Sequence, residues 1–148
     1  MTTYDIILNL PEGWQKEIES YEDESGAIIS HCEAHLYNEA AGKDFGMIDI
    51  YVGDMPDDTT AEDQALSNYA DIVGFDDDDP EDFNPVSTVK FNGKKAFIFE
   101  ALCEDDSPMM FLSQEIRKGV LAIICCAAEN DDKLQETVQL VERGLRLK

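Results

Sequence analysis

The chain has 148 residues with 33 acidic and 11 basic side chains, a formal net charge of −22, and 43% of its residues are apolar. This length allows one domain with a sizeable core, and the apolar content is too high for a wholly disordered chain. The charge repels nucleic acid and anionic lipid, and the longest apolar run, Val120 to Ala128, falls short of the ~20 residues that a membrane helix needs. We therefore expect no nucleic-acid binding and no membrane insertion.

The first half of the chain predicts three strands and one helix. The strands are expected at residues 4–10, 28–37 and 47–53. The last two alternate between apolar and polar side chains, as half-buried strands do. Residues 15–26 are polar and acidic, and we interpret them as a solvated connection, with a short strand at its start as the alternative. Thr60 is an N-cap candidate for a helix that ends near Gly74.

The second half predicts four more strands and a closing helix. The strands are expected at residues 86–91, 94–103, 109–117 and 120–128. Asn92 and Gly93 join the first two, because both positions tolerate the positive φ of a two-residue hairpin turn. These strands carry apolar residues on both faces, so we expect both faces to be covered. Asn130 is the expected N-cap of the last helix.

Together these elements predict an α+β fold, a largely antiparallel sheet of six or seven strands with helices covering both faces, which is an αβα sandwich. We find no domain boundary and no internal repeat, so residues 1–148 are expected to form a single domain. The amino terminus has neither a basic region nor a long apolar segment, and no secretory signal is predicted.

Three stretches of the sequence resemble the PsbP-like fold family, which includes the photosystem oxygen-evolving subunit, a Ran-binding nuclear import factor and bacterial DcrB-type domains. They are the early strand running into residues 10–14 (LPEGW), the turn and strand at 93–97 (GKKAF) and the closing helix at 140–146 (LVERGLR). The resemblance implies one PsbP-like domain with an antiparallel sheet and helices on both sides. It also implies a binding or assembly role, because the family shares no catalytic signature and some bacterial relatives are chaperones of secreted effectors.

His31 and His35 are the most suggestive pair for metal binding. On a helix they would lie one turn apart and could chelate zinc. On a strand they share a face but lie ~13 Å apart, at ~3.3 Å per residue, which is too far to share one ion. Because the alternation favours a strand, we expect two exposed histidines on a polar face, and we predict no metal, cofactor or catalytic residue.

Six acidic residues are our candidate partner-binding site. They are Asp76, Asp77, Asp78, Asp79, Glu81 and Asp82. Their oxygens could collect calcium, but the segment lacks the spacing and the glycine of a helix-loop-helix calcium site, so we favour a solvated loop. Residues 1–89 hold 23 of the 33 acids and only two bases. This asymmetry fits either solubility or a face directed at a basic partner.

The four cysteines match neither a zinc-binding spacing nor a disulfide framework. They are Cys32, Cys103, Cys125 and Cys126. We interpret them as buried, reduced thiols of a cytoplasmic protein. Trp14 follows a Pro/Gly break and is expected to anchor the core or an edge.

We therefore predict a non-catalytic, cytoplasmic binding or assembly module with an acidic surface. Its partner is expected to be a protein, with a basic or apolar segment received as by a chaperone or adaptor. The alternative is a divalent-metal-dependent hydrolase or a calcium-binding protein that uses the acidic residues. The sequence predicts no particular oligomeric state.

Overall fold

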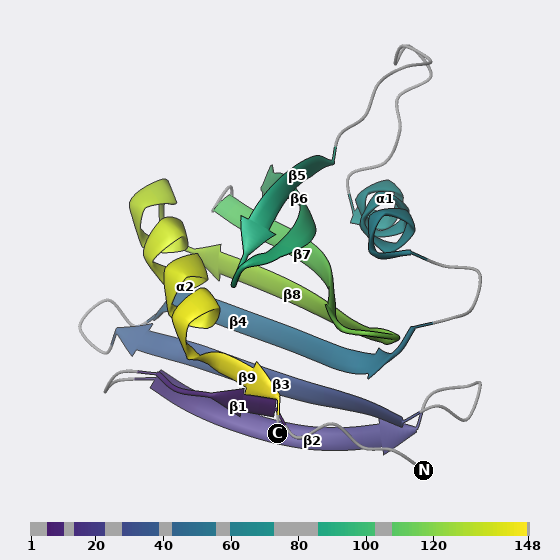
Figure 1. Cartoon of the computed structure of the whole chain (residues 1–148). Helices are drawn as coiled ribbons and strands as arrows, with labels where there is room; N and C mark the ends of the chain where they lie inside the picture. Colours follow the sequence, from purple (N-terminus) through teal and green to yellow (C-terminus); the bar gives the residue numbers. More distant parts are fainter. Residues whose placement is uncertain are drawn as a thin grey trace, which may run out of the picture.

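The computed structural model describes residues 6–10, 14–22, 28–38, 43–55, 60–72, 86–102 and 108–147. These residues form strands and two helices (Figure 1). In chain order the elements are β1 (Ile6–Leu8), β2 (Trp14–Glu22), β3 (Ile28–Asn38), β4 (Lys43–Asp54), α1 (Ala61–Ile72), β5 (Ser87–Phe91), β6 (Lys94–Leu102), β7 (Pro108–Arg117), β8 (Val120–Ala128), α2 (Asp131–Gly144) and β9 (Leu145–Leu147).

Two separate sheets organise the strands. The main sheet has seven strands in the order β2-β3-β4-β8-β7-β6-β5, and every described pairing in it is antiparallel. The other sheet is a two-stranded ribbon of β1 and β9, in which Ile6 lies opposite Leu147 and Leu8 opposite Leu145. The first and last described strands therefore lie side by side.

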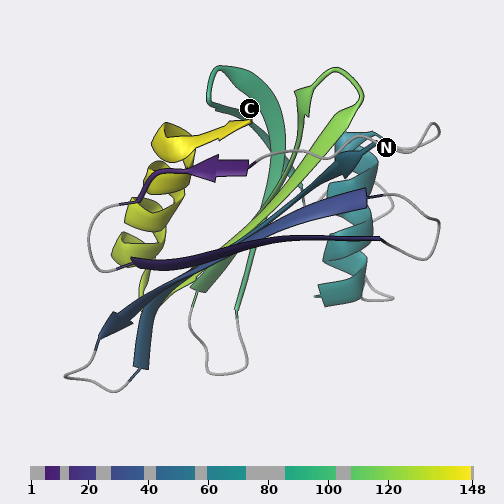
Figure 2. The same cartoon turned by 90° about the horizontal axis from the view of Figure 1, so that it is seen from below.

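The larger core lies on one face of the main sheet, under α2 and the β1–β9 ribbon (Figure 2). Ile50, Ile124 and Leu112 sit next to one another on β4, β8 and β7, and all three are buried. Val141 of α2 and Leu145 of β9 pack against this layer. The apolar stripe of α2 thus closes the core together with a ribbon of strands.

The opposite face carries α1, which contacts β6 and β7. Phe99 of β6 and Phe111 of β7 are buried together with Ala65 of α1. The two phenylalanine rings stack with their centroids 4.9 Å apart. Tyr69 of α1 meets Phe99 edge-on at 5.3 Å between centroids. This second core is small, and among the described elements no helix covers β2, β3 and β4 on this side.

The predicted αβα sandwich, with helices covering both faces, is wrong. The described chain is mostly strand, and its two helices have 12 and 14 residues, too short to shield seven strands. Residues 15–22, which we expected in a solvated connection, belong to β2, whose polar side chains suit the edge of a sheet. Residues 145–147, which we expected in the last helix, form β9. The β1–β9 ribbon therefore covers part of the sheet that we expected helices to cover.

The turn and cap predictions are confirmed. Asn92 and Gly93 adopt φ values of 54° and 81°, as the hairpin turn between β5 and β6 requires. The side chain of Asn130 accepts a hydrogen bond from the Lys133 amide at 2.9 Å and caps α2. Thr60 Oγ1 likewise accepts from the Asp63 amide at 3.1 Å at the start of α1.

None of the described helices is long and apolar enough to cross a membrane.

Candidate functional site

The α1 side of β2, β3 and β4 presents polar side chains outside the small core. Successive side chains of a strand point to opposite faces. On β3, Cys32 and Ala34 are buried in the larger core, while His31, Glu33 and His35 are only partly buried on the other side. The sequence alternation predicted both sets correctly. We call this surface the acidic face, defined by Glu17, Glu19, Glu33 and Asp49.

Three carboxylates of the acidic face stand in a row across three neighbouring strands. Glu17 of β2 lies opposite Glu33 of β3, and Glu33 lies opposite Asp49 of β4. Neighbouring strands are about 4.8 Å apart, and like charges placed directly opposite destabilise a sheet. The row therefore concentrates negative charge at a cost in stability, which a bound cation would relieve.

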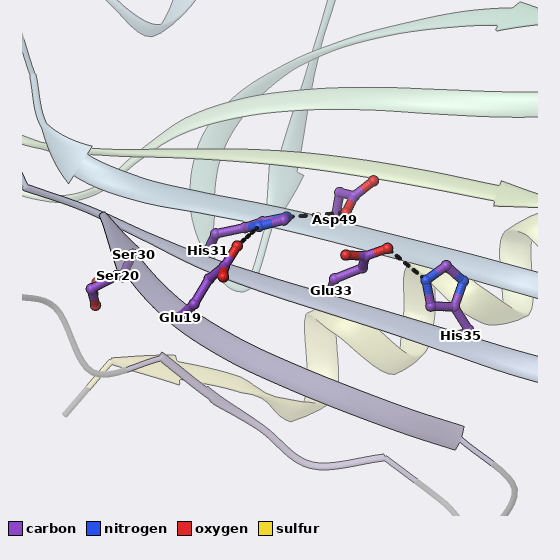
Figure 3. A network of polar contacts seen from close by, with 7 residues as sticks. All are labelled: Glu19, Ser20, Ser30, His31, Glu33, His35 and Asp49. Atoms are coloured by element: carbon purple, nitrogen blue, oxygen red, sulfur yellow. Dashed lines mark hydrogen bonds and ion pairs between the residues drawn. The ribbon is translucent and has the colours of Figure 1, made fainter. Parts of the chain in front are cut away.

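His31 lies between two carboxylates of the acidic face (Figure 3). Its Nε2 is 3.1 Å from Asp49 Oδ1, and its Nδ1 is 3.5 Å from Glu19 Oε1. Its ring stacks on Tyr51, with centroids 4.2 Å apart and planes 4° from parallel. Only 12% of the His31 side chain is exposed. Contacts from both neighbouring strands thus fix the position and plane of this imidazole.

Tyr51 stacks on the imidazole of His31 as an uncharged aromatic ring. Burial raises the pKa of the Tyr51 phenol, and the negative charge of Asp49 raises this pKa further. The phenol therefore keeps its proton at physiological pH, and it adds no further negative charge to the acidic face.

Glu33 is held by the next residue on the same side of β3. His35 Nε2 lies 2.7 Å from Glu33 Oε1 (Figure 3). A hollow of about 360 Å³ beside this pair is lined by Gln15, Lys16, Glu17, Glu33 and His35. The Lys16 ammonium is directed to the other side of the sheet, where it donates to the Leu8 carbonyl at 2.7 Å. Two carboxylates remain in the wall of the hollow, which suits a positively charged guest.

A second hollow, of about 290 Å³, lies between α2 and the strands β5, β6 and β7. Its lining includes Val89, Ile98, Met110 and Val138, with Glu142 at α2. The lining is more apolar than polar, although Lys90 and Glu100 also contribute to it. It therefore differs in chemistry from the acidic face and lies on the other side of the main sheet.

The structure places the predicted site residues as follows. His31 and His35 share one face of a strand, as expected, but the prediction that both are exposed is wrong: Tyr51 covers the His31 ring, and His35 is partly buried. Trp14 packs against the larger core, with its ring over Gly46. The acidic segment lies outside the described residues, and it consists of Asp76, Asp77, Asp78, Asp79, Glu81 and Asp82.

Sequence reasoning missed Asp49 as a neighbour of the histidine. The signal was present, because Asp49 lies between Ile48 and Ile50 and must point away from the core. The sequence did not show how β3 and β4 pair. Their pairing places Asp49 directly opposite Glu33 and diagonally opposite His31.

Cys32 and Cys126 lie on the core side of the sheet and are expected to be unreactive. Burial raises the pKa of Cys32 to about 11, although Lys16 nearby lowers it, and burial also raises the pKa of Cys126. Since the thiolate is the reactive form, iodoacetamide at pH 8 should label both residues only after unfolding. Peptide mass mapping of native and denatured samples checks this, and labelling of native Cys126 would contradict it.

The same thiols give the stability a pH dependence with a definite sign. Between pH 9 and pH 11 the unfolded chain loses its Cys32 proton while the folded chain keeps it. The unfolded state is favoured by this difference, so the free energy of unfolding should fall as the pH rises through that window. Replacing Cys32 with alanine should reduce the fall, which urea unfolding at a series of pH values measures.

Comparison of the chain with models of known protein families, with curated proteins and with solved structures finds no match. The function is therefore proposed from the residues and geometry of this chain and from the resemblance in its sequence.

Proposed function

We propose that the protein is a non-catalytic binding module whose acidic face receives a basic segment of a protein partner. The observation that carries this proposal is the row of Glu17, Glu33 and Asp49, set directly opposite one another on a side of the sheet that no described helix covers. Each pair of like charges placed directly opposite is unfavourable, so the row lowers the stability of the sheet until a positively charged group binds to it.

A basic side chain fits this surface in charge and in size. The hollow beside Glu33 and His35 is large enough, at about 360 Å³, for the end of a lysine or arginine side chain. An arginine there could bind a carboxylate with two parallel hydrogen bonds. The net charge of −22 would also attract a basic partner at long range and speed its association.

The resemblance to the PsbP-like family supports the same proposal, because members of that family act mostly as binding or assembly modules. We propose a chaperone or adaptor role on this ground. A cytoplasmic location agrees with Cys32 and Cys126, which are buried thiols outside any disulfide. The acidic segment at residues 76–82 remains a predicted second contact for the partner.

A short oligo-lysine peptide provides a direct test. Isothermal titration with EDTA present should show binding that weakens as sodium chloride rises from about 50 to about 300 mM, because salt screens exposed charges. The variant Glu17→Gln/Glu33→Gln should bind about 2- to 30-fold more weakly, since each of the two exposed ion pairs contributes ~0.2–1 kcal/mol.

The matched control removes two carboxylates elsewhere. Glu62 of α1 and Glu136 of α2 are exposed and lie outside the acidic face. The variant Glu62→Gln/Glu136→Gln has the same net charge as the test variant and should keep nearly wild-type affinity. Equal weakening by both variants would mean diffuse attraction to the whole molecule, and the proposal would be wrong.

A further inference from the structure

We propose that His31, Glu33 and Asp49 bind one divalent transition-metal ion, with zinc as the best match. Each of the three offers one ligand atom, and these atoms all lie within 4.8 Å of one another. They come from two neighbouring strands, so the sheet holds them in place. The zinc site shares Glu33 and Asp49 with the proposed basic-partner surface, so the peptide titration is made with EDTA and the zinc titration without peptide to test the two proposals separately.

The distances require little movement to close around an ion. Zinc lies about 2.0–2.2 Å from nitrogen and oxygen ligands, so ligand atoms in a tetrahedral site are roughly 3.4 Å apart. His31 Nε2 and Asp49 Oδ1 are already 3.1 Å apart. The side chain of Glu33 is 44% exposed, and rotation of its carboxylate about the oxygen that His35 contacts would bring the other oxygen closer to the ion. Rotation of one carboxylate therefore completes a three-ligand site.

The groups around these three ligands are the ones that metal sites use. Metal-binding histidines commonly donate their second ring nitrogen to a carboxylate, which orients the ring. Here Glu19 Oε1 lies 3.5 Å from His31 Nδ1, which leaves Nε2 directed at Asp49. His35 likewise holds one oxygen of Glu33 at 2.7 Å (Figure 3). This second layer of contacts is what distinguishes the group from an ordinary cluster of surface acids.

The set of ligand atoms selects the kind of metal. Calcium and magnesium prefer oxygen ligands alone, whereas one imidazole with two carboxylates suits zinc and its neighbours among the transition metals. With His31 12% and Asp49 22% exposed, the site is sheltered on the sheet side and open where Glu33 reaches solvent. Water would supply the fourth ligand on that side.

Titration of the full chain with zinc chloride, without peptide, tests the inference. Calorimetry should show one equivalent of zinc bound far more tightly than calcium. The variants His31→Gln and Asp49→Asn should each weaken zinc binding by at least about 100-fold, and Glu19→Gln by about 10-fold, the usual range for an outer contact. Cobalt should give a visible d–d absorption band whose strength reports a low coordination number, and His31→Gln should weaken this band by removing one protein ligand.

Two further variants keep the test decisive. Glu62→Gln removes an exposed carboxylate of α1 that lies outside the acidic face, so it should leave zinc affinity within about 3-fold. Glu33→Gln changes a largely exposed ligand and should lose binding without unfolding, which a circular-dichroism melt verifies. Zinc binding that is weak, exceeds one equivalent and is unchanged in His31→Gln and Glu33→Gln would overturn the proposed site.

Discussion

Replacing Ile124 with alanine is expected to lower the free energy of unfolding by about 2–5 kcal/mol, the usual cost of cutting a buried isoleucine to alanine. Ile124 lies on β8 near the middle of the main sheet, and none of its surface is exposed. It sits opposite Ile50 on one side and Leu112 on the other, so its loss leaves a cavity that two neighbouring strands cannot easily fill. Urea unfolding followed by circular dichroism measures the change.

Ile18→Ala provides the matched control for this change. Ile18 is on the edge strand β2 and is 46% exposed. The same deletion of methyl groups should cost less than about 1 kcal/mol there, because little apolar surface returns to water and no closed cavity forms. Similar losses for the two variants would show that Ile124 is not at the centre of the core.

Gly144→Ala is expected to destabilise the protein by about 2–4 kcal/mol through a clash with the backbone. A Cβ atom at Gly144 would overlap the Asn9 carbonyl oxygen and lie 3.3 Å from the Asn9 nitrogen. The Asn9 amide donates to the Gly144 carbonyl at 3.2 Å, and this bond joins the end of α2 to the segment after β1. The clash should outweigh the ~1 kcal/mol by which alanine favours a helix over glycine.

Gly93→Ala separates this clash from an effect of backbone conformation. Gly93 has a φ of +81°, and a Cβ atom there would meet nothing within 4 Å. The strain should cost about 1–2 kcal/mol, and it should leave the β1–β9 ribbon intact. For Gly144→Ala, hydrogen exchange should instead speed up in Ile6–Leu8 ahead of the main sheet. A Gly144→Ala protein at least as stable as Gly93→Ala would refute the close approach.

Local patterns predicted local structure well. The Asn92–Gly93 turn, the Asn130 cap and the alternation of β3 depend on residues close together in the chain, and all three are present. β2 was missed because its side chains do not alternate between buried and exposed. One side of this edge strand faces solvent, and few residues cover the other side. The β1–β9 pairing was missed because it depends on where α2 places the end of the chain.

The candidate site was likewise predicted only where it depends on residues close together in the chain. Alternation placed His31, Glu33 and His35 on one side of a strand, and the rise per residue showed that the two histidines cannot share an ion. The approach of Asp49 depends on the register between β3 and β4, which shifts at Leu36/Tyr37. A shift of two residues would have kept Asp49 on the same face but opposite another residue, so sequence alternation could not decide which acids meet His31.

The β1–β9 ribbon has a consequence for how the chain folds. Ile6 pairs with Leu147, whereas β5 and β6 are joined by a two-residue turn. Contacts between distant parts of a chain form slowly, because the entropy of closing the loop is lost before the contact is gained. We therefore expect the hairpins to form early and the ribbon to dock last. Until it does, nascent chains keep part of their apolar layer uncovered, and this interval is when they are most prone to self-association.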